Sequence, residues 1–515
     1  MHESEQARLL GDEPLDATLF TSNAGRRQLE TRILPRYLQR SRWFAGKARR
    51  PTGFVLAEMI PLGAAWILVV DVRYADGASE SYLVPLALAE NSPPRAIPAP
   101  AVAAEDGSHI LYDAIYNRDF RARLIALLAS AESMQTAHGS LVGTAGNALA
   151  DLPLDADSRV LAVEQSNSSV IYDERLFLKL YRKLEPGVNP DAEITRFLSE
   201  EQKFAHVPPF GGSLELRVAK AAPRVIALAT GVVENRGDAW SVALQEVEQF
   251  YERARTASST VDVRLLAGNY LERAHLLGRR TGEMHAALGA PVDDPRFGIA
   301  LMTSRDLEEL AQSIEKSLQN ISNLLRCEEN PARSEAARAF LGAQKPIADF
   351  VADLRRLAPN ETTKIRTHGD YHLGQVLDTG NDFVIIDFEG EPLRPLAWRQ
   401  EKRSPLRDVA GMLRSFEYAA YSRLEERSPD ERALVAPWTR RWVEAVGADF
   451  LGGWKAAVRG TPVVSHRESE DTTLGELLRA YLIEKALYEI GYELSHRPDW
   501  VGIPVAGILA LVGKN

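Results

Sequence analysis

The sequence predicts an α+β protein with two lobes, a strand-rich first part and a mainly helical second part. Strand-like runs such as AAWILVVDVRY and SYLVPLALA lie early in the chain, whereas helical periodicity dominates from about residue 260 onward. A chain of 515 residues is also too long for one core of ordinary size. A strand-rich part followed by a helical part therefore indicates two packed lobes with a cleft between them.

The composition is that of a globular enzyme. Hydrophobic residues make up 45% of the chain and charged residues 26%. The formal net charge of −10 disfavours a nucleic-acid binder, which needs a basic stripe. The single cysteine, Cys327, excludes an intrachain disulfide and favours a reducing compartment. The sequence has neither a secretory signal nor an apolar run long enough for a membrane span, so we expect a cytoplasmic protein without membrane partners.

The early chain is expected to form a small α+β unit. A helix is predicted over residues 27–41, and the two strand-like runs that follow are separated by Ala75-Asp76-Gly77, a hairpin signal. Residues 91–104 hold four prolines and predict an extended connection. A helix containing FRARLIALLA comes next, after which strand character resumes. The predicted domain boundaries are 1–110, 111–240 and 241–515.

The stretch RTHGDYHLGQVLDTGNDFVIIDFEGEP carries the predicted chemistry. Two β-rich segments flank the turn residues Gly380-Asn381-Asp382. A hairpin centred on Asn381 places Gln375 opposite Asp387, about 5 Å apart. An amide oxygen and a carboxylate then converge, and such ligands suit Mg²⁺, which takes one or two protein oxygens beside phosphate and water.

Asp370 lies just before this hairpin and is expected to face the same point. An aspartate there accepts the proton of an attacking hydroxyl during phosphoryl transfer. Kinase catalytic and metal loops have the same order: an aspartate, an amide five residues later and a second aspartate at a strand end. An ordinary hairpin with solvated polar ends accounts for each residue alone but poorly for all three. ATP and Mg²⁺ are therefore the predicted cofactors.

The same segments resemble a known superfamily. HGDYHLGQVL followed by IDFEGEP resembles the aminoglycoside-phosphotransferase and sugar-kinase superfamily, and RPLAWRQEKRSPLRDVAGMLRSFEYAA is similar to the bacterial maltokinase family. RWFAGK near the start and EKALYEIGYE near the end extend the similarity over most of the chain. The resemblance implies a protein-kinase-like bilobal fold, with an N-terminal cap subdomain over residues 1–110 and a helical C-lobe.

The resemblance also implies an acceptor and a partner. It implies transfer of the γ-phosphoryl group of ATP to the anomeric hydroxyl of maltose, in a route from trehalose to glucan with trehalose synthase as a partner. The first alternative is a related kinase that acts on glucosamine or an aminoglycoside. The second is a non-catalytic scaffold for trehalose synthase, which the intact Asp370, Gln375 and Asp387 disfavour.

The strand-rich lobe has no glycine-rich phosphate loop. EQSNSSVIYDE takes its place, and small polar residues can hold phosphates through backbone N–H groups and side-chain donors. The residues alone predict a polar hairpin. The resemblance implies that this segment covers the phosphates, with four contributing residues: Gln165, Ser166, Asn167 and Ser168.

The next strand, RLFLKLYR, presents Lys179 on the face opposite its leucines, from which it can pair with the α- and β-phosphates. Lys183 has the same parity, but Lys179 is favoured because it lies within the apolar run. Glu193 follows in a helix that begins with Asn189 as N-cap and Pro190 at the first position. It is expected either to orient Lys179 or simply to favour the positive helix end.

Two further helices and one histidine carry candidate site residues. Helix 474–496 carries Lys485, Tyr488 and Tyr492 on one stripe. The pattern alone favours tyrosines that cover core, whereas the resemblance implies that these three residues line the sugar site. His372 is expected either to assist the acceptor or to form a structural hydrogen bond. Asp408 stands in the first turn of another helix, where an acid favours the positive helix end in any case. The resemblance implies that it also hydrogen-bonds the backbone of the catalytic loop.

Overall fold

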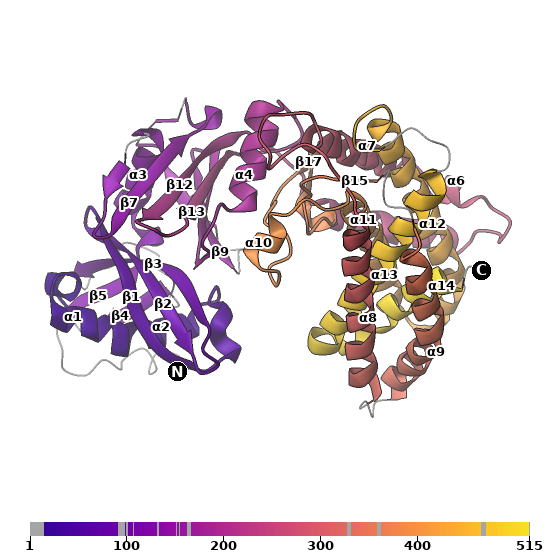
Figure 1. The fold of residues 1–515 in the computed structure, drawn as a ribbon, viewed down its shortest axis with the longest axis horizontal. Coiled ribbons are helices and arrows are strands. Elements are labelled where there is room, and N and C mark those ends of the chain that lie inside the picture. The colour runs from indigo at the N-terminus through magenta and orange to yellow at the C-terminus, as the bar shows by residue number, and fades with distance from the viewer. Residues whose placement is uncertain are drawn as a thin grey trace. The chain divides into compact units, whose positions relative to one another are not determined.

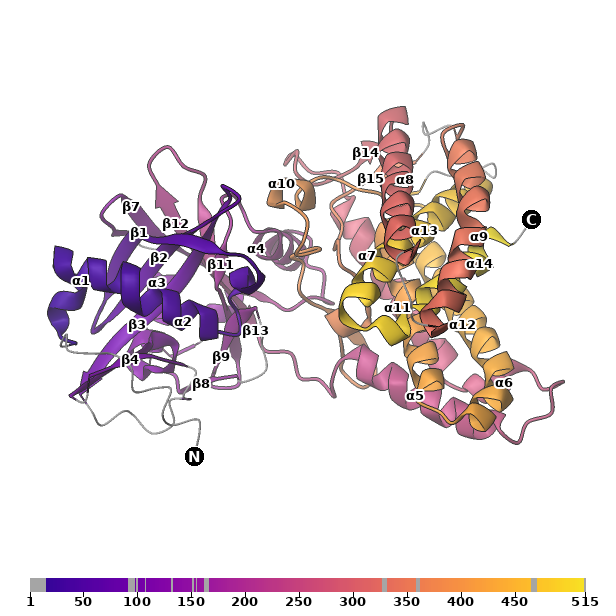
Figure 2. The ribbon, with the colours of Figure 1, turned by 90° about the horizontal axis from the view of Figure 1, so that it is seen from below.

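The computed structural model describes residues 15–90, 98, 101–106, 108–130, 133–150, 152–153, 155–161, 166–326, 331–357, 362–464 and 470–513 (Figures 1 and 2). Gln165, Cys327 and most of the predicted proline-rich connection lie outside these residues. The chain divides into two compact units. The first comprises Met1–Glu201 and Pro208–Val232, and the second comprises Gln202–Val207 and Val233–Asn515.

An antiparallel sheet and an N-terminal helical segment open the first unit. The strand order is β1-β2-β3-β5-β4, and β11 also pairs with β3. The strands are β1 (Pro51–Leu62), β2 (Ala65–Tyr74), β3 (Ser79–Glu90), β4 (Val102–Glu105), β5 (His109–Asp113) and β11 (Lys183–Leu184). Gly77, at φ +83°, closes the hairpin between β2 and β3, which confirms the predicted turn.

The predicted helix over residues 27–41 is present and begins slightly earlier. It consists of α1 (Asn23–Gln28), a π-helical turn (Leu29–Ile33) and α2 (Leu34–Arg40). Its apolar side chains share a core with the sheet, in which Leu34, Leu38 and Val70 are fully buried. Figure 1 shows these indigo helices lying along β1 to β5.

A second antiparallel sheet in the same unit has the order β6-β7-β12-β13-β10-β9-β8. The strands are β6 (Ser133–Gln135), β7 (Gly139–Ala145), β8 (Ser158–Val160), β9 (Asn167–Tyr172), β10 (Leu176–Tyr181), β12 (Phe210–Val218) and β13 (Arg224–Gly231). Helix α3 (Arg118–Ser130) contains the predicted FRARLIALLA and packs against β7, and α4 (Pro190–Arg196) follows β10.

The second unit is mainly helical. Its helices are α5 (Ala239–Ala254), α6 (Val263–Ala267), α7 (Tyr270–Leu288), α8 (Ser304–Arg326), α9 (Pro331–Leu354), α10 (Leu396–Arg399), α11 (Leu406–Glu425), α12 (Pro429–Val458), α13 (Glu470–His496) and α14 (Gly502–Val512). The unit also contains two short antiparallel strand pairs. The strands β16 (Val376–Asp378) and β17 (Phe383–Ile385) form a hairpin, whereas β14 (Ala300–Leu301) and β15 (Thr363–Lys364) pair across the intervening α8 and α9. Helices α7 and α12 approach so closely that a Cβ at Gly278 would lie 1.9 Å from the Phe450 carbonyl oxygen.

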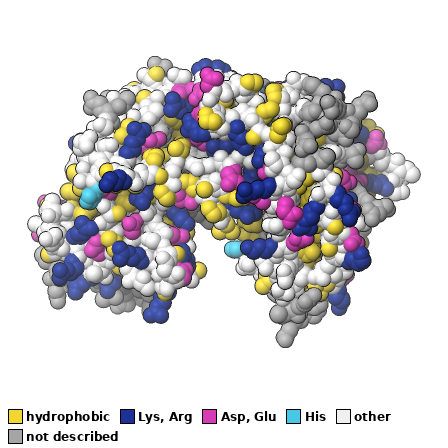
Figure 3. Space-filling view, viewed as in Figure 1, with side chains coloured by type: hydrophobic (Ala, Val, Ile, Leu, Met, Phe, Trp, Pro, Cys, Tyr) yellow, Lys and Arg dark blue, Asp and Glu magenta, His cyan; other side chains and the backbone are white. Residues whose placement is uncertain are grey.

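Charges on the helical unit are arranged in pairs. Arg355, directly after α9, contacts Glu308 and Glu315 on α8 at 2.8 and 2.7 Å, for example. On the face drawn in Figure 3, basic and acidic side chains are interspersed instead of forming a field of one sign. Within the described ranges, no helix combines the length and apolarity needed to cross a bilayer.

Candidate active site

A buried carboxylate holds the loop that contains Asp370. Asp408, in the first turn of α11, is 1% exposed and accepts hydrogen bonds from the backbone N–H groups of His368 at 2.8 Å and Gly369 at 3.0 Å. Burial alone would raise the pKa of Asp408, but its bonds to His285 and Gly369 and the nearby histidines bring that pKa below its ordinary value. The predicted link between Asp408 and the catalytic-loop backbone is confirmed.

A chain of hydrogen bonds holds Asp408 in place. The Trp454 indole N–H donates to His285 Nδ1 at 3.0 Å, and His285 Nε2 lies 3.1 Å from Asp408 Oδ2. Because an indole can only donate, His285 Nδ1 accepts and Nε2 carries the proton given to Asp408. Helices α12, α7 and α11 are thereby connected to the loop through side chains that are almost fully buried.

Helix α11 also touches the loop backbone through a glycine. A Cβ at Gly411 would lie 2.5 Å from the Tyr371 carbonyl oxygen, so an alanine there would push the loop away. Tyr371 is itself buried, with its hydroxyl 2.9 Å from Thr281 Oγ1. The loop therefore has little room to yield.

Gly411→Ala is expected to lower the free energy of unfolding by about 1–3 kcal/mol, because overpacking outweighs the better helix propensity of alanine. It should also reduce turnover, since the displaced backbone carries Asp370. Urea denaturation and initial rates check both effects. Gly475→Ala on α13 is the control, because its added methyl group meets nothing within 4 Å. Equal behaviour of the two variants would contradict the proposed close contact.

The hairpin after the loop has a different register from the one predicted. Its pairs are Val376 with Ile385, Leu377 with Val384 and Asp378 with Phe383. The turn is centred between Gly380, at φ +98°, and Asn381, since the N–H of residue 379 bonds the carbonyl of residue 382. The predicted centre on Asn381 was wrong by half a residue, so Gln375 stands opposite Ile386 and not Asp387.

The side chains of Gln375 and Asp387 nevertheless meet. Gln375 Nε2 donates to Asp387 Oδ2 at 2.9 Å. Asp387 has φ +67°, a conformation rare for a non-glycine residue, and the chain turns there directly after β17. His368 Nε2 also lies 2.9 Å from the Ile386 carbonyl oxygen, which ties the catalytic loop to this strand end. The convergence predicted from the wrong register is thus produced by a backbone turn.

These two residues fit a divalent cation chemically. A carboxylate and a carboxamide supply hard oxygen ligands, and Mg²⁺ needs few of them from protein when phosphates and water complete the shell. Gln375 presents its N–H to Asp387 in this arrangement, so rotation of the amide would be required to aim its oxygen at an ion. The assignment of Gln375 and Asp387 as metal ligands stays a prediction.

Asp370 and Lys485 face each other across the candidate acceptor side. Lys485 Nζ lies 3.4 Å from Asp370 Oδ1 and 3.5 Å from Glu391 Oε1. Burial alone would lower the pKa of Lys485, but the charges of Asp370, Glu391 and Glu489 raise it above its ordinary value. The side chain is therefore an ammonium ion between two carboxylates.

A hollow of about 520 Å³, counting the space open to solvent, lies beside this pair. Its lining comes from the catalytic loop, from the segment between β17 and α10, and from α8, α11 and α13: Ser313, Ser317, Gly369, Tyr371, Glu391, Arg394, Arg407, Gly411, Tyr481, Glu484, Lys485 and Tyr488. Lys485 Nζ lies 5.1 Å from the centre of the Tyr488 ring. Tyr492 is not among these residues; it is 41% exposed and stacks on His496 at 4.3 Å.

His372 has a clear structural role. It caps the short helix Leu373–Gln375, and its Nδ1 accepts the N–H of Gly374 at 3.1 Å. Burial lowers the pKa of His372, although the charge of Asp370 opposes the shift, so the ring is neutral at pH 7. The predicted structural alternative is supported, and contact with the acceptor stays a prediction.

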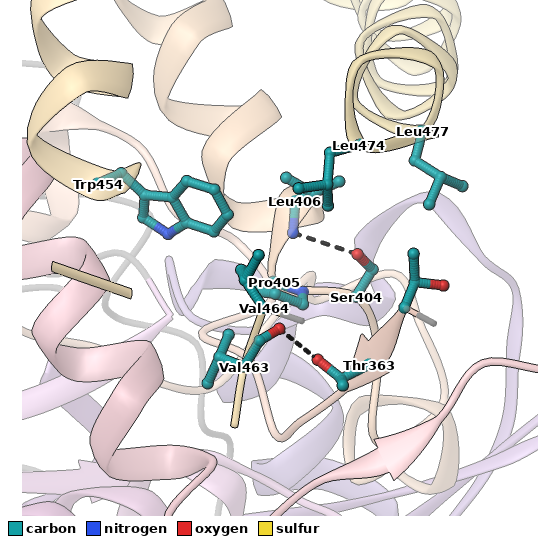
Figure 4. Close-up of a pocket in the computed structure, with 10 residues that line it drawn as sticks. Thr363, Ser404, Pro405, Leu406, Trp454, Val463, Val464, Leu474 and Leu477 are labelled. Atoms are coloured by element: carbon teal, nitrogen blue, oxygen red, sulfur yellow. Dashed lines mark hydrogen bonds between the residues drawn. The ribbon is translucent and has the colours of Figure 1, made fainter. Parts of the chain in front are cut away.

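A second, mainly apolar cavity lies at the start of α11 (Figure 4). Thr363 Oγ1 donates to the Val463 carbonyl there, and the Leu406 N–H donates to Ser404 Oγ at 3.3 Å. None of the predicted site residues lines it. The hollow beside Asp370 is therefore the stronger candidate for the acceptor.

In the first unit, Lys179 occupies the predicted face of β10. Leu176, Leu178 and Leu180 are fully buried in the core on the other face. Lys179 Nζ lies 3.1 Å from Asp191 Oδ2, and the Tyr181 hydroxyl donates to the same oxygen at 3.0 Å.

Sequence reasoning missed Asp191. Its backbone N–H is held by the predicted N-cap, Asn189, at 2.8 Å, and that N-cap was the available signal. Lys183 contacts Glu80 on β3 at 2.9 Å, which supports the choice of Lys179. The pairing of Glu193 with Lys179 stays a prediction.

The predicted phosphate-covering residues are only partly in a loop. Asn167 and Ser168 lie in β9, opposite Tyr181 and Leu180, whereas Ser166 is at the bend before the strand. Ser168 Oγ accepts a hydrogen bond from the buried Arg182 at 2.8 Å. The hydroxyl of Ser168 therefore faces the interior, and its predicted role toward phosphate has no support from this contact.

Lys179→Met is expected to lower kcat/KM for ATP by roughly 10- to 100-fold, because a charge-assisted contact is lost and Asp191 loses its cation. Lys183→Met is the matched control: Lys183 is 41% exposed, and its ion pair should matter little. Steady-state kinetics with varied ATP compares the two variants. A larger loss of kcat/KM for Lys183→Met than for Lys179→Met would show that the nucleotide role belongs to Lys183.

Comparison with known proteins agrees with this fold. Residues 37–117 match the family described as the maltokinase N-terminal cap domain. The chain is 28% identical to glucosamine kinase of Streptacidiphilus jiangxiensis over 363 residues, which is 69% of this chain and 74% of that protein. It is 24% identical to glucosamine kinase of Mycolicibacterium smegmatis over 359 residues, covering 69% and 80%.

Solved structures extend the likeness over nearly the whole chain. Glucosamine kinase in complex with glucosamine, ADP and inorganic phosphate aligns with a TM-score of 0.64 at 23% identity, covering 90% of this chain and 94% of that one. A second crystal form of glucosamine kinase gives a TM-score of 0.66 at 22% identity, covering 91% and 96%. The predicted bilobal, kinase-like α+β fold is confirmed. Together, the kinase relatives and the kinase fold support a phosphotransferase.

Proposed function

We propose that this chain transfers the γ-phosphoryl group of ATP to a hydroxyl group of a sugar. The observation that carries the proposal is the meeting of Gln375 and Asp387 at a strand end that His368 ties to the loop of Asp370. These residue types in this order suit a nucleotide–metal complex beside a proton acceptor.

Each residue has a distinct task in this proposal. Asp370 accepts the proton of the acceptor hydroxyl, and Asp408 keeps the loop of Asp370 in place through two backbone hydrogen bonds. Lys179, oriented by Asp191, binds the nucleotide phosphates. Gln375 and Asp387 would hold Mg²⁺, which supplies neutralising charge to the phosphates when bound.

The acceptor is a sugar that fits beside Asp370, and two identities are proposed. The names of the sequence relatives and of the structural neighbours favour glucosamine over the maltose suggested by sequence motifs. The match to the maltokinase cap domain is the specific observation that keeps maltose as a second candidate.

An acceptor panel tests the proposal. ADP release with ATP and Mg²⁺ should rise when one sugar of the panel is added, and the phosphorylated sugar should be isolated from the mixture. The panel contains glucosamine, glucose, maltose and an aminoglycoside. ADP release that no sugar stimulates, from protein shown to be folded, would refute the proposed function.

A further inference from the structure

Every acid at the hollow beside Asp370 is matched by a cation. Three cations, Arg394, Arg407 and Lys485, and two carboxylates, Glu391 and Glu484, contribute to its lining, and Asp370 is the third acid at its edge. Such a surface is unusual for a site that must accept a positively charged molecule, because an ammonium ion seeks a carboxylate that has no other cation.

Glu391 is already neutralised from three directions. It is 3% exposed, and its carboxylate lies 3.1 Å from Arg394 Nε, 3.2 Å from an Arg407 nitrogen and 3.5 Å from Lys485 Nζ. Burial alone would raise the pKa of Glu391, but these three cations bring it below the ordinary value. Glu391 is therefore an anion whose charge the protein itself balances.

Glu484 is engaged in the same way. One of its oxygens lies 2.7 Å from Arg407, and the other accepts the Ser313 hydroxyl at 2.8 Å. Asp370, the remaining acid at this place, faces Lys485 at 3.4 Å. Each of the three carboxylates thus has a protein cation within contact distance.

Lys485 already supplies these carboxylates with the kind of cation that an amino group of the acceptor would offer. Its ammonium bridges Asp370 and Glu391 and lies over the ring of Tyr488. A second ammonium in this hollow would meet Lys485 as a like charge at short range, in surroundings with little water to screen it. A neutral hydroxyl could instead accept a hydrogen bond from Lys485 without that repulsion.

We propose that this hollow selects neutral sugars over aminosugars, and that Lys485 is the residue that sets the selection. This inference rests on the proposed function and narrows its substrate class. The relatives are named for glucosamine, an aminosugar, so the inference distinguishes this chain from them by its preference for neutral acceptors. Rejection through a like charge is an ordinary means of specificity.

Glucose and glucosamine provide the cleanest comparison, because they differ only in the group at one carbon. At about pH 6.5, where an amine of this kind is mostly protonated, wild-type protein should favour glucose in kcat/KM by at least about tenfold. Maltose should behave as a neutral sugar too. Glucosamine should also be a poor competitive inhibitor of the better neutral acceptor.

Two substitutions test the role of Lys485. Lys485→Met removes the charge at nearly constant length and should reduce the preference for glucose over glucosamine at least about tenfold. Lys485→Arg keeps the charge and should retain the preference. Because each ratio compares two sugars on one variant, a loss of turnover from the contact with Asp370 cancels. Lys345→Met, an 83% exposed position on α9, is the control and should leave the ratio unchanged.

The possible outcomes are separable. A wild-type preference for glucosamine over glucose overturns the inference and leaves the proposed kinase function standing. A ratio that Lys485→Met does not move also overturns it. If Lys485→Met is inactive with both sugars, the inhibition constants of glucosamine and glucose are measured instead, from the inhibition of ATP turnover by the wild type. Equal constants contradict the inference. Failure to phosphorylate any sugar would instead refute the proposed function itself.

Discussion

Asp370→Asn is expected to lower turnover by about 10²- to 10⁴-fold, the usual contribution of a positioned proton acceptor. The amide keeps the shape of the side chain but cannot take the hydroxyl proton, so binding of ATP should change little. Initial rates and nucleotide titration with the purified variant measure the two quantities separately. The free energy of unfolding should stay near that of the wild type, because Asp370 is partly exposed and its ion pair with Lys485 is long, at 3.4 Å.

Asp349→Asn on α9 provides the matched control for that result. Asp349 is exposed and pairs with Lys345 one helical turn away, so its replacement should leave turnover unchanged. If Asp370→Asn retained wild-type turnover, the proton acceptor would have to be assigned elsewhere.

Asp408→Asn is expected to lower the free energy of unfolding by about 3 kcal/mol, and turnover with it. Its two oxygens receive three donors, the N–H groups of His368 and Gly369 and Nε2–H of His285. An asparagine offers one oxygen and turns an N–H₂ group toward a donor, so a buried hydrogen bond is lost. Urea denaturation monitored by tryptophan fluorescence measures the loss.

Asp430→Asn is the comparison for this variant. Asp430 is an exposed acid in the first turn of α12, where its removal should cost less than about 1 kcal/mol. A similarly small effect at Asp408 would show that the loop does not depend on the buried carboxylate. Together, the Asp370 and Asp408 substitutions separate chemistry from architecture, since only the second should change stability.

The sequence predicted those parts of the fold that depend on local pattern. The helix over 27–41, the turn at Gly77 and the N-cap at Asn189 were all found, because periodicity and turn residues are short-range signals. The hairpin register was harder. Asn381 and Gly380 both favour turns, and the chain places the centre of the hairpin between them.

Side-chain partners across long sequence separations were the least predictable part of the site. Lys179 was chosen from strand parity, but its contact with Asp191 requires knowing how α4 packs against β10. The engagement of Ser168 by Arg182 was missed for the same reason. Tyr492 shares a helical stripe with Lys485 and Tyr488, yet it stacks on His496, because a stripe does not fix which end of a helix reaches a hollow.

The charge pattern around the acceptor also lay beyond sequence reasoning. Glu391, Arg407 and Glu484 come from a loop and two helices, and nothing in their spacing indicates that they neutralise one another. Glu391 was not singled out in the sequence. Its burial gives the acceptor hollow a different electrostatic character from a simple acidic site.

Phosphorus NMR of one reaction mixture shows where the γ-phosphoryl group of ATP goes. Wild-type protein is incubated with ATP, Mg²⁺ and a single sugar from the panel, and the resonances of ATP, ADP, free phosphate and sugar phosphate are followed together. We expect ADP and a sugar phosphate to accumulate in equal amounts for at least one sugar, and Asp370→Asn to slow both by about 10²- to 10⁴-fold. Conversion of ATP into ADP and free phosphate, with no sugar phosphate from any sugar, would rule out the proposed transfer.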